Sequence, residues 1–123
     1  MNSMTIQYFT DQEEIIVDLL VKTGTQRNVA RILVFLVKTP KASSRDLEHG
    51  TGLRQSEISV GMQFLIRKKW IDTWDYREKP RGRPMIMYRL SKKIGTILDS
   101  IQRDNEKRSA FQMARLKNWK DLV

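Results

Sequence analysis

The segment SSRDLEHGTGLRQSEIS, residues 43–59, decides the fold that this sequence predicts. Ser43 or Ser44 is expected to cap a short helix, because serine side chains satisfy free amides at a helix start. Leu47 is the apolar anchor of that helix, and Gly50 is expected to end it. A tight connector follows at once, so a second helix can begin within the same segment.

The second half of the segment opens a longer helix, predicted from about Gln55 to Lys68. Its apolar side chains recur at the spacing of one buried helix face: Ile58, Met62 and Leu65. The side chains on the opposite face are mostly polar. Residues 43–59 therefore predict two helices joined by a tight turn, with one polar helix face left for solvent or a ligand.

Two short β-like runs follow, Trp70–Tyr76 and Met85–Leu90, and they predict a β-hairpin. Alternating side chains of the second run are expected to pack inwards: Ile86, Tyr88 and Leu90. The hairpin tip is EKPRGRP, residues 78–84, in which each proline fixes its own φ and extends the residue before it. Gly82 lets the backbone approach another surface closely. The tip is either a thin cationic finger for a polyanion or an ordinary solvated turn.

Amphipathic helices flank this central part. The TDQE sequence at residues 10–13 matches a capping box, so a first helix is expected to begin at Thr10. A second helix is expected over about 25–38, with Arg27 and Arg31 on its outer side. From Ser91 onward the chain is expected to be helical again. The N-terminal apolar stripe is Ile15, Ile16, Leu19 and Leu20, and the C-terminal sets are Ile94, Ile97, Leu98 and Ile101, then Phe111, Met113, Leu116 and Trp119.

The predicted order of elements is that of a winged helix-turn-helix. The fold class is mainly α with a small β-hairpin (α+β), with flanking N- and C-terminal helices. We divide the chain into an N-terminal helix at 1–24, a winged helix-turn-helix DNA-binding domain at 25–92 and a C-terminal helix at 93–123. The terminal helices are expected to form a homodimer, the alternative being that they fold back on their own subunit.

The net charge of +9 lies in the second part of the chain. Residues 1–53 hold six Lys or Arg and six Asp or Glu, whereas residues 54–123 hold seventeen and eight. Residues 67–93 alone hold ten basic and three acidic residues. Charge of one sign on a small domain indicates a polyanionic partner, nucleic acid first and an acidic membrane surface second. A basic surface kept only for solubility is the remaining alternative.

Residues 43–59 resemble the helix-turn-helix of winged-helix transcription regulators. The matching positions are Leu47, Thr51-Gly52-Leu53, Gln55-Ser56 and Ile58-Ser59. The Arg-Gly-Arg-Pro wing and the Tyr88-Arg89-Leu90-Ser91 that follows look like predicted archaeal regulators of the ArsR- and MarR-like class. The resemblance spans about residues 25–92 and departs at Lys69, where family members often have glycine. It implies a sequence-specific transcriptional regulator that binds double-stranded DNA.

In such a fold the second helix of the pair enters the major groove, and the wing reaches the minor groove. The candidate recognition-helix residues are Arg54, Gln55, Ser56, Ser59, Val60, Gln63 and Arg67. The candidate wing residues are Arg77, Lys79, Arg81, Gly82 and Arg83, with Arg81 and Arg83 in the minor groove. The candidate phosphate contacts are Ser44, Lys68 and Lys69.

Enzyme and metal chemistry find no support in the sequence. It has no cysteine, one histidine (His49) and no nucleophile–base pair, Gly-rich phosphate loop or metal-like carboxylate cluster. We therefore expect no catalysis, no metal and no cofactor, and no effector pocket is evident. The longest apolar run, Ile32–Val37, is too short to span a bilayer. A cytoplasmic, nucleoid-associated protein is expected.

Two other functions fit the same residues. An architectural protein that coats DNA without sequence preference would explain the basic patch equally well. A winged-helix module that docks a protein partner is the second alternative, and joint exposure of Phe64, Ile66 and Trp74 would be its sign.

Overall fold

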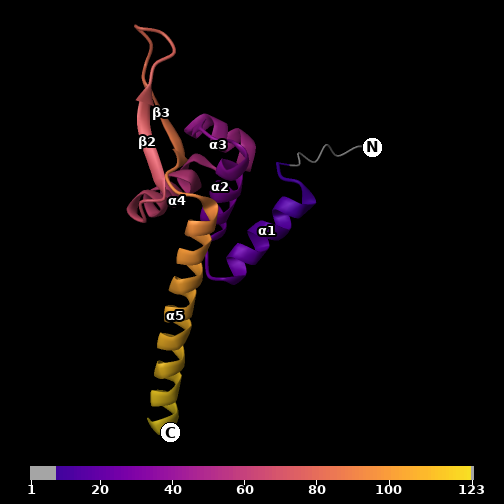
Figure 1. Cartoon of the computed structure of the whole chain (residues 1–123), viewed down its shortest axis with the longest axis vertical. Helices are drawn as coiled ribbons and strands as arrows, with labels where there is room; N and C mark the ends of the chain where they lie inside the picture. The colour runs from indigo at the N-terminus through magenta and orange to yellow at the C-terminus, as the bar shows by residue number, and fades with distance from the viewer. Residues whose placement is uncertain (1–7, 123) are drawn as a thin grey trace.

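The computed structural model describes residues 8–122, which form five helices and three short strands (Figure 1). The elements are α1 (Asp11–Lys22), α2 (Arg27–Lys38), β1 (Ala42–Ser43), α3 (Ser44–Thr51), α4 (Gln55–Arg67), β2 (Ile71–Tyr76), β3 (Met85–Leu90) and α5 (Ile94–Leu122). The predicted class, a mainly α winged helix-turn-helix with a small hairpin, is confirmed. Strand β1 was not predicted. Residues 1–7 and 123, which we assigned to the terminal helices, lie outside the described residues.

The predicted capping box opens α1. Thr10 Oγ1 accepts the N–H of Glu13 at 3.1 Å, and Glu13 Oε1 accepts the N–H of Thr10 at 2.8 Å. Lys38 Nζ on α2 lies 3.3 Å from the same Glu13 oxygen. These contacts, the Thr10 N–H above all, hold the pKa of Glu13 below its ordinary value. The start of α1 is thus tied both to its own first turn and to α2.

Helix α2 forms the centre of the core. Its buried residues are Val29, Ala30, Ile32, Leu33, Val34, Phe35 and Leu36. The helix contacts α1, α3 and α4. The crossing with α4 is close because Gly61 has no side chain: a Cβ there would lie 2.8 Å from Ile32 Cδ1. Helix α4 is therefore positioned by direct packing on the most buried helix of the domain.

Helix α3 and the turn after it differ in one detail from the sequence expectation. Ser43 caps α3 and forms a capping box with Asp46. The prediction that Gly50 ends the helix is wrong, because α3 continues through Thr51 and Gly52 adopts the left-handed conformation with φ 73°. Gly50 is required for space instead, since a Cβ there would collide with the ring of Phe35. Only residues 52–54 connect α3 to α4.

The strands form one antiparallel sheet in the order β1-β3-β2. Tyr88 on the central strand pairs with Ala42 of β1 and Thr73 of β2, and its side chain is buried. The prediction that Ile86 packs inwards is wrong, because its side chain is 49% exposed. Figure 1 shows the physical reason: the hairpin extends beyond the helices, so its distal half has no core to cover it.

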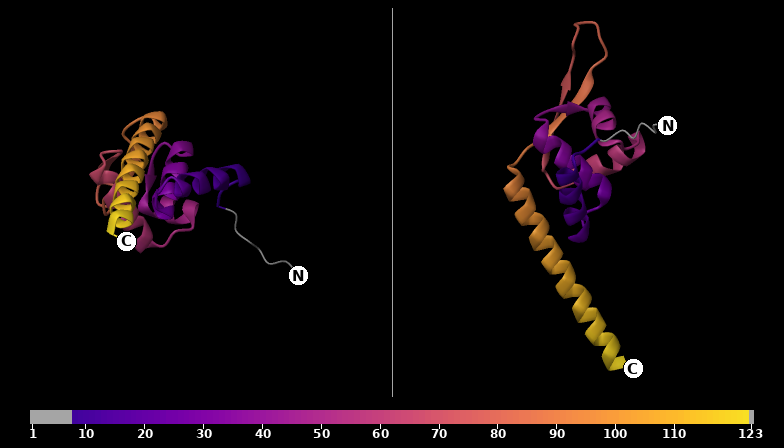
Figure 2. Two further views of the ribbon diagram at one scale, coloured as in Figure 1. Left: turned by 90° about the horizontal axis from the view of Figure 1, so that it is seen from below. Right: turned by 90° about the vertical axis from the view of Figure 1, so that its right-hand side faces the viewer.

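The terminal helices pack on the body only in part. Val17 and Leu20 of α1 and Ile97 and Ile101 of α5 are buried. The C-terminal part of α5 extends away from the body, as Figure 1 and the right-hand view of Figure 2 show. Apolar side chains that remain exposed on these two helices include Ile15, Ile16, Leu19, Leu98, Phe111, Met113, Leu116 and Trp119. One subunit alone therefore leaves apolar helix surface uncovered.

Candidate nucleic-acid interface

The polar face of α4 is open to solvent. The predicted apolar positions Ile58, Met62 and Leu65 are all buried. This face of α4 packs on the core, so the opposite face points to solvent. The side chains exposed on its outer surface, or at its start, are Arg54, Gln55, Ser56, Ser59, Val60, Gln63 and Arg67. The structure thus brings all seven candidate recognition-helix residues to an accessible position, four of them within the first turn and a half of α4 or directly before it.

Two contacts fix the start of α4. Glu57 Oε1 accepts the N–H of Arg54 at 3.1 Å, which satisfies one free amide of the first turn. Asn28 Nδ2 on α2 donates to the Glu57 carbonyl oxygen at 2.9 Å. A helix start held in this way presents its remaining N–H groups and its positive dipole end to a phosphate in a constant direction.

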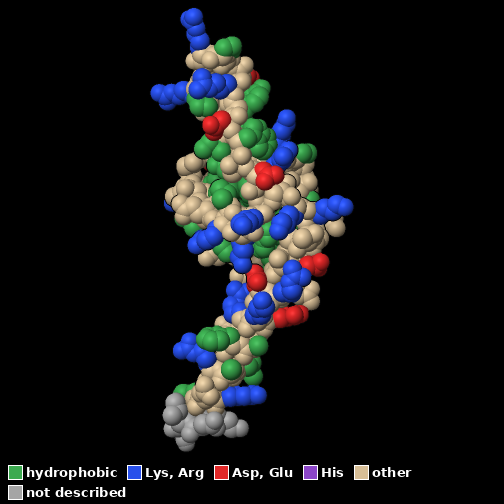
Figure 3. Space-filling model, turned by 60° about the vertical axis from the view of Figure 1, so that its left-hand side comes forward, with side chains coloured by type: hydrophobic (Ala, Val, Ile, Leu, Met, Phe, Trp, Pro, Cys, Tyr) green, Lys and Arg blue, Asp and Glu red, His purple; other side chains and the backbone are tan. Residues whose placement is uncertain are grey.

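The wing carries its cations away from the body of the domain. Arg77, Lys79, Arg81 and Arg83 are exposed, and Gly82 is half-buried in a turn closed by its N–H to the Lys79 carbonyl oxygen at 2.9 Å. None of the ion pairs among the side chains of residues 8–119 involves a wing cation. Figure 3 shows basic side chains on the hairpin and over the body on the face it presents. The wing charges are therefore available to an external anion.

The three candidate phosphate contacts lie in different settings. Ser44 is half-buried at the start of α3. Lys69 is exposed and adopts φ 63°, the left-handed conformation that glycine adopts more readily than a residue with a side chain. Lys68 Nζ bonds to Asp104 Oδ2 at 2.9 Å and lies 5.8 and 5.9 Å from the rings of Phe64 and Trp70. Lys68 is thus attached to α5.

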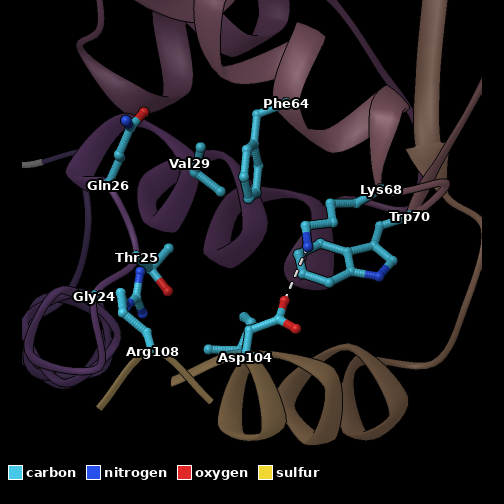
Figure 4. A pocket seen from close by; sticks show the side chains of 10 residues that line it. Gly24, Thr25, Gln26, Val29, Phe64, Lys68, Trp70, Asp104 and Arg108 are labelled. Carbon is cyan, nitrogen blue, oxygen red and sulfur yellow. Dashed lines mark hydrogen bonds and ion pairs between the residues drawn. The ribbon is translucent and has the colours of Figure 1, made fainter. Parts of the chain in front are cut away.

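A cavity of about 270 Å³ separates this part of α5 from the body (Figure 4). The Lys68–Asp104 pair crosses it, and Lys68 holds the pKa of Asp104 below its ordinary value. Arg108 lies beside Gly24 and donates to the Thr23 carbonyl oxygen at 3.0 Å. Two polar links therefore attach the middle of α5, one to the end of α4 and one to the end of α1.

Arg45 was missed by the sequence analysis. It is exposed on α3 and lines an open groove of about 600 Å³ between α3 and the wing, together with Ser44 and the strand residues near the hairpin tip. Helix α3 and the wing lie far apart in the sequence, so only the strand pairing between β1 and β3 could have revealed this cation as a neighbour of the wing.

The residues that would indicate a protein-docking module are not exposed together. Phe64 is half-buried and packs edge-on against Trp70, with ring centroids 6.1 Å apart. Trp74 is half-buried beneath Arg89, whose guanidinium carbon lies 5.3 Å from the ring centroid. Only Ile66 is exposed, at 45%. The expected sign of that alternative is therefore lacking on the described surface.

Two features that the described residues lack bear on other kinds of function. Among residues 8–119, no group of three or more His, Asp or Glu side chains is arranged to hold a metal ion. In the same range, no helix combines the length and the apolar character needed to cross a membrane.

Comparison with known proteins identifies the fold. No protein-family model and no curated protein sequence matches the chain. Among solved structures, a possible transcriptional regulator from Methanosarcina mazei is 15% identical, with a TM-score of 0.59 over 84% of this chain and 88% of that one. A MarR-family transcription regulator is 19% identical, with a TM-score of 0.54 over 91% and 76%.

A third solved structure is Bordetella bronchiseptica BpsR, whose DNA binding is regulated by 6-hydroxynicotinic acid. It is 12% identical, with a TM-score of 0.51 over 91% of this chain and 86% of that one. At these identities the likeness concerns the fold alone, and it agrees with the winged helix that the sequence resemblance implied.

Proposed function

We propose that this chain is a transcriptional regulator that binds double-stranded DNA in a sequence-dependent manner. The observation that carries the proposal is the joint exposure of a polar recognition-helix face and of a wing whose cations have no ion-pair partner among residues 8–119. The winged-helix fold shared with solved transcription regulators supports it.

Base recognition is assigned to the start of α4. Gln55 can bond both N6 and N7 of an adenine, and Arg54 can bond a guanine edge or a phosphate. Val60 is 54% exposed and can contact a thymine methyl group. Ser56 and Ser59 can donate to bases or to phosphates.

The wing is assigned to the minor groove. Arg81 and Arg83 flank Gly82, so both guanidinium groups extend from a narrow stretch of backbone. A narrow A·T-rich minor groove has enhanced negative potential and attracts such side chains. Arg77, Lys79, Lys69 and Arg45 are assigned to phosphates, where they raise affinity and its salt dependence without reading sequence.

A homodimer completes the proposal. Helix α1 exposes Ile15, Ile16 and Leu19, and α5 exposes Leu98, Phe111, Met113, Leu116 and Trp119. A second copy could cover this apolar surface, and a two-fold dimer would place two recognition helices on two DNA half-sites.

The DNA proposal is tested by selecting duplexes from a random library with the wild-type protein and measuring their affinity by fluorescence anisotropy. Arg81→Ala together with Arg83→Ala should weaken binding by about 10-fold or more and reduce the preference for A·T-rich flanks. The control is Lys22→Ala with Lys107→Ala, which removes the same charge from α1 and α5. Wild-type affinity in the wing variant would exclude the minor-groove role. A steep salt dependence with no enriched sequence would favour the architectural alternative instead.

The dimer is tested separately by sedimentation equilibrium. Leu116→Asp with Trp119→Asp should lower the mass from two chains to one, because both side chains lie exposed on one side of α5. Ala110→Asp is the control, since the helical period places it on another side of the helix. A wild-type protein with the mass of one chain would contradict the dimer and leave the DNA proposal to its own test.

A further inference from the structure

Arg31 joins three parts of the domain, although the sequence pattern placed it on the outer side of its helix. Its Nε and Nη2 donate to the Thr51 carbonyl oxygen at 3.0 and 2.8 Å. Its Nη1 donates to Glu14 Oε1 on α1 at 2.7 Å. The guanidinium carbon lies 4.5 Å from the ring centroid of Phe9. Only 13% of the side chain is exposed, so the group is largely committed to these contacts.

Thr51 is the last residue of α3 and stands directly before the turn to the recognition helix. A carbonyl at a helix C-terminus lacks an intrahelical donor and carries partial negative charge, so a bidentate arginine suits it. The side chain of Thr51 is also engaged: its hydroxyl donates to the Leu47 carbonyl oxygen at 2.5 Å and accepts the N–H of Leu53 at 3.2 Å. Arg31 therefore holds the residue on which the turn depends.

We infer that Arg31 is a positioning residue for DNA recognition, which fixes the helix-turn-helix turn to α1 through Glu14. The inference rests on the proposed function. In a dimer built on α1, this link sets the direction of α4 relative to the dimer axis, and so the register of the two recognition helices on DNA. Arg31 acts through the turn, because its donors are directed at Thr51 and Glu14 within its own subunit.

The chain supplies a matched control on the same two helices. Arg27 Nη2 lies 3.2 Å from Asp18 Oδ1, again joining α2 to α1. Both side chains of that pair are more than half exposed, and Arg27 donates to Asp18 rather than to the turn. If the Arg31 link only held α1 on α2, replacing either arginine would change the turn and the DNA affinity in the same way.

The first measurement is amide hydrogen exchange of the free protein for Arg31→Lys and the control Arg27→Lys. Lysine keeps the charge but cannot donate two N–H bonds to the Thr51 carbonyl oxygen while also reaching Glu14. Exchange at residues 52–54 should rise about 10-fold in Arg31→Lys, a size set by the charge-assisted bonds that it loses, and stay unchanged in Arg27→Lys. Equal exchange at the turn in both variants would overturn the inference.

The second measurement is the ratio of affinities for a wild-type-selected duplex and for random duplex. Arg31→Lys should lower this ratio about 10-fold, and the charge-removing Arg31→Gln should lower it at least as much at an unchanged salt slope. A slope reduced by about one in Arg31→Gln would make Arg31 itself a phosphate ligand and overturn the positioning role. The same two measurements are repeated for Glu14→Gln, with Asp18→Asn as its control. The side chain of Glu14 is 46% exposed, so this substitution leaves the core intact. If the wild type selects no duplex, the proposed function fails, and the exchange experiment still decides whether Arg31 fixes the turn.

Discussion

Replacing Gly61 with alanine should destabilise the protein, although alanine is the better helix former. A Cβ at position 61 would lie 2.8 Å from Ile32 Cδ1 and 3.3 Å from Asn28 Nδ2. Ile32 is fully buried, and Asn28 is held by its hydrogen bond to the Glu57 carbonyl oxygen. Neither group can move aside without disturbing the contact between α2 and α4.

The magnitude follows from two opposing effects. Helix propensity favours alanine over glycine by about 1 kcal/mol. Overpacking of a well-packed core costs about 1–3 kcal/mol. We therefore expect Gly61→Ala to lower the free energy of unfolding by about 1 kcal/mol, the difference between the middle of that range and the propensity gain. Ile32→Val, which removes the colliding Cδ1, should by itself cost about 0.5–1.5 kcal/mol.

The decisive measurement is a double-mutant cycle by urea unfolding, followed by far-UV circular dichroism. In the Ile32→Val background the new methyl group occupies the vacated space, so Gly61→Ala should become neutral or stabilising. The coupling energy should reach about 1–3 kcal/mol, equal to the overpacking that is relieved. Additive effects within about 0.5 kcal/mol would refute the reasoning, because they would mean that the two positions do not press on each other.

Three further predictions concern other contacts. Gly52→Ala should destabilise by about 1–2 kcal/mol in the same urea assay, because φ 73° is strained for alanine; Gly95→Ala, which has nothing within 4 Å of its new Cβ, is the control and should not destabilise. The pKa of Glu13 is lowered, so its contribution to stability is present above its ordinary pKa of 4.5 and is lost as the pH falls through the lower folded value. In Glu13→Gln the melting temperature should therefore fall less steeply as the pH is lowered below 4.5 than it does in the wild type. An unchanged dependence of melting temperature on pH would contradict this. Lys68→Met should raise the pKa of Asp104 towards 3.8, as carboxyl NMR titration would reveal, whereas no change would mean that the pair does not persist in solution.

Features that depend on neighbouring residues in the chain were predictable. The capping box of Thr10 and Glu13 and the buried spacing of Ile58, Met62 and Leu65 are local patterns, and the structure confirms both. The same periodicity placed the candidate recognition-helix residues on the outer face, where the structure has them. Whether those side chains touch DNA remains a prediction.

Features that depend on distant residues could not be read from the sequence. Gly50 looked like a helix stop, but its role is set by Phe35, fifteen positions earlier. Lys68 looked like a free cation, yet its partner Asp104 lies 36 residues away. Arg31 matched an outer helix position, yet its side chain donates to the carbonyl oxygen of Thr51, 20 residues later. In each case the tertiary fold supplies a partner that a local pattern does not contain.

The strand order β1-β3-β2 leaves β2 at the edge of the sheet, where backbone N–H and C=O groups could pair with another chain. If two copies of β2 paired antiparallel over their full length, Ile71 would face Tyr76, and Asp72 would face Asp75 of the second copy, twice over. Like charges directly opposite each other destabilise such a ladder. The two aspartates within the most basic stretch of the chain would thus oppose the growth of a continuous intermolecular sheet along β2.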